Sequence, residues 1–196
     1  NQPFYQRVQT LAGQPPLSLP LPMTNILSGG LHAGRGMDVQ DFLAMPARAT
    51  SLADAIHVLS RVRNAATDEA RARGLPTLLA DEGGISPGLA TGREALDMML
   101  RIIERAGLRP GEDVVIAIDV AATSLQAPQG GYALQREGRH VEASEMIEML
   151  VDWVQHYPVV SIEDGLGEED WHAWAELTRR VGHQVQLVGD DLFTTH

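Results

Sequence analysis

The sequence predicts an α/β fold in which a parallel β-sheet is covered by helices. Two observations support this. Short apolar runs alternate along the chain with longer segments of helical period, and most of these runs end in an acidic residue. An open doubly wound sheet and a (β/α) barrel both have this order of elements. We favour the barrel because no strand is followed by a glycine-rich phosphate-binding fingerprint.

The first half of the chain contains a proline-rich start and two amphipathic segments. Residues 1–20 are expected to form a linker or entry segment. Helical spacing over 51–73 and 91–106 predicts two helices, the second with Thr91 and Glu94 at capping-box spacing. Between them, the apolar run 75–80 is expected to form a short strand.

The second half repeats strand and helix. The runs 114–118, 159–162 and 185–189 predict buried strands, and 142–156 and 168–181 predict helices. A polar stretch with glycines at 130, 131 and 138 predicts a small hairpin.

The composition narrows the function classes. A formal net charge of −11 over 196 residues and 5% aromatic residues argue against binding to nucleic acids or anionic membranes. No apolar run approaches the roughly 18 residues needed to span a bilayer. Cysteine is absent, which excludes disulfides and thiolate catalysis and is compatible with a cytoplasmic location. All 15 basic residues are arginine, so this chain offers no lysine base.

Three predicted strands end in carboxylates, at Asp119, Glu163 and Asp190. The carboxyl ends of parallel strands meet at one edge of a sheet, so these side chains should converge and need a cation to neutralise them. An all-oxygen ligand set suits Mg²⁺ better than Zn²⁺. Alternatively, each acid only caps the next helix, a role that fits Asp164 and Asp191 better.

Further polar residues lie in the predicted loops. Glu82 would face the same edge and could act as a general acid if burial raised its pKa, or it could be a solvated turn residue. His32 follows Gly29–Gly30 and precedes Gln40 and Asp41. A loop histidine on its own is usually a surface residue, and the glycine pair fits a tight turn equally well.

Six segments in order resemble the enolase family, phosphopyruvate hydratases, over about residues 19–195. They are PMTNILSGGLHA at 22–33, QDF at 40–42, DEGG at 81–84, AIDVAA at 117–122, SIEDG at 161–165 and VGDDL at 188–192. The resemblance implies an enolase-type (β/α)8 barrel domain over 21–196 whose second strand runs antiparallel. About six of eight strands are expected, near 23–27, 39–45, 77–81, 114–119, 159–163 and 186–190, with the N-terminal α+β domain absent.

The resemblance also implies a reaction, the Mg²⁺-dependent dehydration of 2-phosphoglycerate to phosphoenolpyruvate. It assigns Asp119, Glu163 and Asp190 as metal ligands and Glu82 as the proton donor. It assigns substrate-binding roles to three residues, His32, Gln40 and Asp41. The phosphorylated acid would be the partner, in a cytoplasmic homo-oligomer (dimer or octamer) with a cell-surface or secreted fraction.

Some features depart from the family pattern. The family's lysine base lies on the next barrel strand, so we expect this chain to be a segment of a longer enzyme. Asp41 stands where the family usually has glutamate, and Ser28 where it usually has asparagine. These changes keep two alternatives open: a paralogue acting on another 2-hydroxy or 2-phospho acid, and a non-catalytic binding protein.

Overall fold

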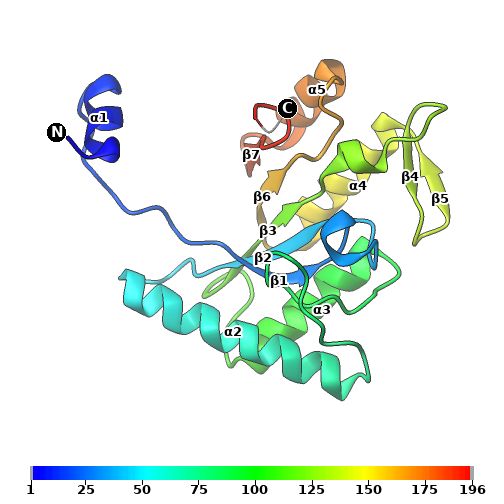
Figure 1. Cartoon of the computed structure of the whole chain (residues 1–196), viewed down its shortest axis with the longest axis horizontal. Helices are drawn as coiled ribbons and strands as arrows, with labels where there is room; N and C mark the ends of the chain where they lie inside the picture. Colours follow the sequence, from blue (N-terminus) through cyan, green and yellow to red (C-terminus); the bar gives the residue numbers. More distant parts are fainter. Residues whose placement is uncertain (1, 195–196) are drawn as a thin grey trace.

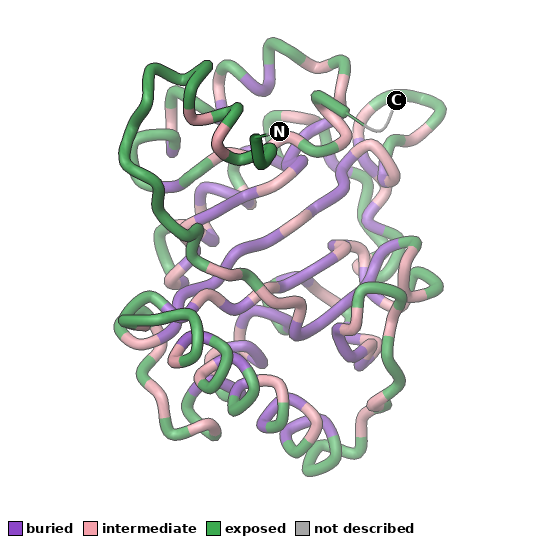
Figure 2. The backbone as a smooth tube through the Cα atoms, turned by 60° about the vertical axis from the view of Figure 1, so that its left-hand side comes forward, coloured by how far each residue is buried: buried purple, intermediate pink, exposed green. Residues whose placement is uncertain are grey.

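A computed structural model describes residues 2–194, and an open five-stranded sheet forms its centre. Figure 2 shows the buried strands running through the middle of the molecule. The strands, in spatial order, are β1 (Thr24–Ser28), β2 (Asp41–Met45), β3 (Val115–Asp119), β6 (Val159–Glu163) and β7 (Gln186–Val188). The predicted α/β class and the incomplete barrel are confirmed, because β1 and β7 lie at the two edges of the sheet and do not pair with each other to close a barrel.

Strand β2 runs against both of its neighbours, whereas β3, β6 and β7 pair in parallel. This is the antiparallel second strand that the resemblance implied. As a result, the first residue of β2 lies at the sheet edge where the other strands end. The functional consequence is that Asp41, which begins β2, joins the strand-end residues.

The predicted helices form with small shifts at their ends. Helices α2 (Leu52–Ala72) and α3 (Gly92–Arg105) pack on each other and on β1 and β2. Helix α4 (Ala143–His156) packs on β6 and on α5 (Trp171–Val181) (Figure 1).

Smaller elements complete the fold. The predicted hairpin is confirmed as β4 (Tyr132–Leu134) paired with β5 (Arg139–Val141). Two 3₁₀ turns, η1 (Leu31–Ala33) and η2 (Ala122–Leu125), follow β1 and β3 respectively. Both turns lie at the edge of the sheet that carries the strand-end acids, where His32 of η1 and Ser124 of η2 line the same cavity as these acids.

Helices α2 and α3 each begin at a side-chain cap: Ser51 at α2 and Thr91, which the sequence predicted, at α3. Ser51 accepts a hydrogen bond from the Asp54 amide, and Thr91 accepts one from the Glu94 amide, at 3.1 and 3.0 Å. The predicted capping box at Thr91 is only half formed, because the Glu94 carboxylate accepts from the amide of Ala90 instead.

The expected strand at 77–81 is wrong. Only an isolated bridge between Leu79 and Ile85 forms there, and α2 and α3 follow each other without an intervening strand. The apolar run misled the prediction because Leu78 and Leu79 are 77% and 66% exposed. The loop instead runs along β1: the Ile85 amide donates to Ile26 and the Ser28 amide donates to Ile85. The main sheet therefore has five strands rather than six.

The entry segment contains a helix that the sequence analysis did not foresee. Helix α1 (Phe4–Leu11) buries none of its residues and stands apart from the sheet at the end of an extended segment (Figure 1). Within the part of the chain that the structure describes, every helix is too short or too polar to cross a membrane.

Candidate active site

A row of polar residues crosses the sheet at one edge. Ser28 on β1 pairs with Asp41 on β2, Asp41 pairs with Asp119 on β3, and Asp119 pairs with Glu163 on β6. Three carboxylates therefore stand on adjacent strands. The reversed direction of β2 puts the start of that strand in register with the ends of the others.

A cavity of about 320 Å³ opens over this row. Its lining contains all seven residues that the sequence and the resemblance singled out: His32, Gln40, Asp41, Glu82, Asp119, Glu163 and Asp190. Among the residues that the structure describes, seven carboxylates line the cavity and no arginine does. This imbalance makes the cavity strongly attractive to cations.

Asp119 lies at the centre of the row. The Gln40 amide donates to its Oδ2 and the Ala121 backbone amide to its Oδ1, each at 3.0 Å. Burial, together with the nearby charge of Glu163, raises the pKa of Asp119 to about 8. The two hydrogen bonds act in the opposite direction but do not offset burial.

Glu163 and Asp190 differ in their surroundings. Burial and then the charges of Asp164 and Asp190 raise the pKa of Glu163. Asp190 is exposed at the cavity rim, and its Oδ1 accepts a hydrogen bond from the Thr194 hydroxyl at 2.8 Å. The structure thus brings Asp119 and Glu163 side by side and leaves Asp190 further out.

Asp164 organises the turn that carries Asp190. Its own backbone is left-handed (φ 40°), and it is buried. Its Oδ2 accepts from the amides of Asp190 and Asp191, at 3.2 and 2.8 Å. Asp164 thus holds the turn after β7 and does not cap the next helix, α5, whose N-cap is Asp170, so the expected capping role is wrong for Asp164. Asp191 itself lines the cavity, and burial raises its pKa.

Asp41 is almost completely buried, with 1% of its surface exposed. The Ser28 hydroxyl donates to its Oδ1, while its buried Oδ2 has no hydrogen-bond partner. Burial raises the pKa of Asp41 to about 6 even though the Ser28 hydrogen bond lowers it. Gly84 packs against this pair, since a Cβ at that position would lie 2.1 Å from the Ser28 hydroxyl.

Glu82 is held by two partners in front of the row. One of its carboxylate oxygens lies 2.9 Å from His32 Nδ1, and the other accepts from the Asn25 amide at 2.9 Å. The Asp81 amide donates to the His32 carbonyl, which joins the two loops. Glu82 and His32 remain about half exposed, at 47% and 39% of their side chains.

Asn25 is a cavity residue that the sequence reasoning did not single out. It lies within β1, where an apolar-strand pattern gives no reason to expect a polar group facing the site. The available signal was an amide side chain directly before the buried pair Ile26 and Leu27.

The loop from Gly29 to Gln40 closes tightly over the strand ends. The Gly29 amide donates to Gln40 at 2.6 Å and the Gly30 amide to Met37 at 2.9 Å. Gly30 has φ +52°, and a Cβ there would lie 3.1 Å from Gln40 Cα. The glycine pair is thus a tight turn that positions Gln40 and His32 at the cavity.

The carboxylates fit a hard cation such as Mg²⁺. Asp119, Glu163 and Asp190 offer only oxygen, and burial together with the charge of Glu163 disfavours the charged form of Asp119, an effect that a bound cation would offset. Among the described residues, however, the ligand atoms that gather within 4.8 Å of one another belong to His32, Asp41 and Glu82. The three predicted metal ligands share the cavity without gathering so closely.

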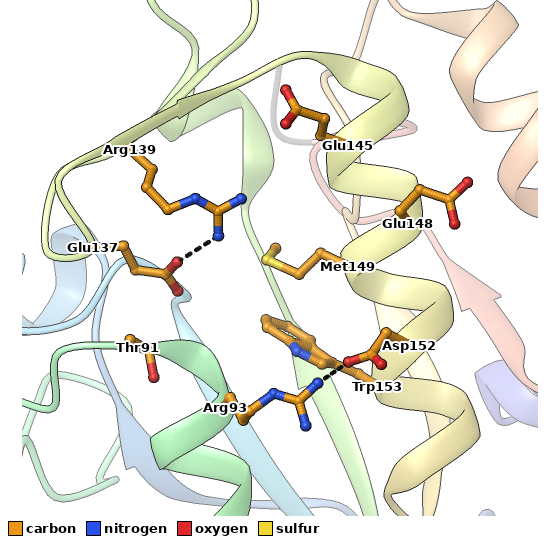
Figure 3. Close-up of a pocket in the computed structure, with 9 residues that line it drawn as sticks. All are labelled: Thr91, Arg93, Glu137, Arg139, Glu145, Glu148, Met149, Asp152 and Trp153. Atoms are coloured by element: carbon orange, nitrogen blue, oxygen red, sulfur yellow. Dashed lines mark hydrogen bonds and ion pairs between the residues drawn. The ribbon is translucent and has the colours of Figure 1, made fainter.

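A second cavity, of about 500 Å³, lies between α3, α4 and the β4–β5 hairpin (Figure 3). Its charges are satisfied within the protein: Arg93 pairs with Asp152, and Arg139 pairs with Glu137 at 3.1 Å. Its floor is formed by Met149 and Trp153. Because its ion pairs are internal, this cavity lacks the unbalanced charge of the strand-end site.

Comparison with known protein families gives one match. A family model described as the enolase C-terminal TIM barrel domain matches residues 16–196, which is nearly the whole chain. The matched range contains the sheet, its covering helices and every residue of the candidate site.

Proposed function

The chain belongs to the family of enolase C-terminal TIM barrel domains, and from this premise we propose that it carries the metal- and substrate-binding part of an enolase. The proposed reaction is the Mg²⁺-dependent dehydration of 2-phosphoglycerate to phosphoenolpyruvate. This step belongs to glycolysis and gluconeogenesis, which implies a cytoplasmic enzyme. The observation that carries the proposal is the row of carboxylates over a cavity without arginine.

The chemistry explains why such a row is useful. The proton to be removed lies next to a carboxylate and is only weakly acidic, because its loss puts a second negative charge on that carboxylate. A bound Mg²⁺ would supply positive charge to the substrate carboxylate. In this chain Asp119, Glu163 and Asp190 would hold the ion, and the Gln40 amide fixes the orientation of Asp119.

Glu82 is the proposed proton donor to the departing hydroxyl. Its contacts with His32 and Asn25 fix the direction of its carboxyl group, and its partial exposure leaves room for a ligand in front of it. His32, Gln40 and Asp41 would surround the substrate.

The proposed reaction also needs a base that accepts the C2 proton. The family uses a lysine, and the 196 residues contain none. We therefore assign to this chain the binding of the metal and the protonation of the leaving group, and not the removal of the C2 proton.

The test is turnover of 2-phosphoglycerate by the full-length gene product. We expect phosphoenolpyruvate formation that a chelator abolishes and added Mg²⁺ restores. Asp119→Asn should reduce kcat/KM by at least about 100-fold, whereas Asp113→Asn, in an exposed ion pair with Arg109, should not. Equal activity of both variants would refute the assignment of Asp119.

One observation favours a second candidate. The buried Ser28–Asp41 pair replaces the asparagine and glutamate usual in the family, which changes the shape of the cavity wall. If the folded enzyme binds Mg²⁺ but leaves 2-phosphoglycerate unchanged, a paralogue acting on another 2-hydroxy or 2-phospho acid is favoured. Failure to bind Mg²⁺ would favour a non-catalytic binding protein.

A further inference from the structure

Three side chains from three separate segments meet in front of the carboxylate row. His32 comes from η1, Asp41 from the start of β2, and Glu82 from the loop between α2 and α3. One ligand atom from each lies within 4.8 Å of the other two. In addition, His32 Nδ1 and a Glu82 carboxylate oxygen are 2.9 Å apart.

The buried oxygen of Asp41 points to a missing partner. Asp41 Oδ1 accepts from Ser28, but Oδ2 is fully buried and has no hydrogen bond. Leaving a buried carboxylate oxygen without a partner is unfavourable unless a ligand satisfies it. Because Asp41 lines the cavity, a ligand held there by His32 and Glu82 could supply that partner.

The dimensions suit a metal ion. Zinc bonds of about 2.0–2.2 Å to nitrogen or oxygen, at tetrahedral angles, place two ligand atoms about 3.4 Å apart. The ligand atoms of this cluster lie within 4.8 Å of one another, so a bound ion would draw them closer together. Asp41 is fixed by burial, while the half-exposed side chains of His32 and Glu82 can rotate inward by the small amount required.

The donor set differs from the all-oxygen set of Asp119, Glu163 and Asp190. One imidazole nitrogen with two carboxylates is a set that favours Zn²⁺ and neighbouring transition metals, whereas Mg²⁺ prefers oxygen alone. We propose that His32, Asp41 and Glu82 form a second cation site that binds a transition metal such as Zn²⁺ in preference to Mg²⁺. The proposal rests on this geometry and does not depend on which reaction the enzyme catalyses.

The surrounding charge supports a cation at this place. The same cavity wall carries Asp119 and Glu163, and no arginine lines it to balance them. His32 is the sole lining residue, among those described, that can itself become positively charged. A divalent ion between His32 and Glu82 would replace their direct contact with one bond from the ion to each side chain.

The test uses Co²⁺ as a spectroscopic probe on the full-length protein, with Mg²⁺ in saturating excess to fill the carboxylate site. We expect a visible d–d absorption band that Zn²⁺ abolishes and Mg²⁺ does not. His32→Gln should weaken Co²⁺ binding by at least about tenfold. The matched variant His57→Gln, exposed on α2 and outside the cavity, should bind as the wild type does.

Two further measurements keep the test decisive. In the unmodified protein, Zn²⁺ should shift the imidazole ¹⁵N signals of His32 and not those of His57, a readout that needs no variant to fold. Asp190→Asn should keep the Co²⁺ band, because Asp190 belongs to the other site. Unchanged His32 signals, or equal Co²⁺ affinity in His32→Gln and wild type, would overturn the proposal. None of these readouts depends on turnover.

Discussion

Asp119 and Asp41 hold their protons more tightly than free aspartates, because burial penalises their charged forms. An acid whose pKa is higher in the folded state binds more protons there than in the unfolded chain. Its contribution to the free energy of unfolding is therefore greatest at low pH and is lost as the pH rises through the folded pKa. For Asp41 this window runs from about 4 to about 6, and for Asp119 from about 4 to about 8.

We accordingly predict that, in the presence of a chelator, the free energy of unfolding falls as the pH rises from 6 to 8. Asp119→Asn should remove much of this fall, because its side chain cannot ionise. Urea unfolding at a series of pH values measures the effect. A slope identical in the variant and the wild type would show that Asp119 is not the group responsible.

A second prediction concerns Ser28, which donates to the buried Asp41. Ser28→Ala should lower the free energy of unfolding by about 1–3 kcal/mol, because the buried Asp41 Oδ1 loses the hydroxyl that donates to it. It should also raise the pKa of Asp41 further, since the Ser28 hydrogen bond lowers it. Urea unfolding and carboxyl ¹³C titration measure the two effects. Ser28→Thr, which keeps the hydroxyl, provides the comparison, and an unchanged Asp41 titration in Ser28→Ala would contradict the prediction.

The pattern of the sequence alone identified some of the site residues but not all of them. Asp119, Glu163 and Asp190 could be found because acids at the ends of parallel strands share an edge. Asp41 could not be found in this way, since it begins a strand that runs in the reverse direction, and only the family resemblance identified it. The unpartnered state of its Oδ2 depends on packing by neighbouring segments, which no local pattern records.

An ion pair joins helices α2 and α3, and only one of its partners, Glu69, is buried. Glu69 is 8% exposed and accepts from Arg105 Nε and Nη2, at 2.8 and 2.7 Å, whereas Arg105 is 44% exposed. We predict that Arg105→Met costs about 1–3 kcal/mol because it leaves a buried carboxylate unpaired. The double variant with Glu69→Leu should recover part of the loss. Denaturant unfolding of the full cycle tests this, and simple additivity of the two changes would refute it.

The start of α3 gives a further prediction. Thr91→Ala should lower the free energy of unfolding by about 1 kcal/mol, because the Glu94 amide loses its acceptor. Thr91→Ser keeps the acceptor oxygen and should stay close to the wild type. Thermal unfolding of both variants measures the difference, and equal losses would exclude capping as the cause.

At the scale of elements, amphipathic periodicity identified the long helices, because each has one buried face. It failed at 77–81, where Leu78 and Leu79 form an apolar run that the fold leaves exposed. It also missed α1. This helix buries none of its residues, so packing does not require an apolar face that the sequence pattern could show.

The molecule as a whole leaves apolar surface beside its last strand. A groove of about 420 Å³ lies between α5 and β7, and Trp171 and Phe193 at this groove are 58% and 71% exposed. On its outer side, β7 pairs with no other strand of the described chain. Unpaired strands beside exposed apolar groups favour association.

We therefore predict that the isolated 196-residue chain self-associates as its concentration rises. The double variant Trp171→Glu/Phe193→Glu should weaken this association. Phe4→Glu, which changes a still more exposed aromatic residue on α1, outside the groove, should not. Sedimentation velocity over a range of concentrations measures the effect, and a monomer at all concentrations would contradict it.

The reversed strand β2 has a consequence for how such a protein can diversify. Both ends of the 28–41 segment are anchored at the same edge of the sheet, by the pairing of Ser28 with Asp41 and the bond from Gly29 to Gln40. Between these anchors, Met37 and Val39 are buried in the core and hold the second half of the segment in place, whereas no residue of η1 is buried. Homologues can therefore vary the part of the segment around η1 to alter ligand preference while the core contacts of Met37 and Val39 are kept.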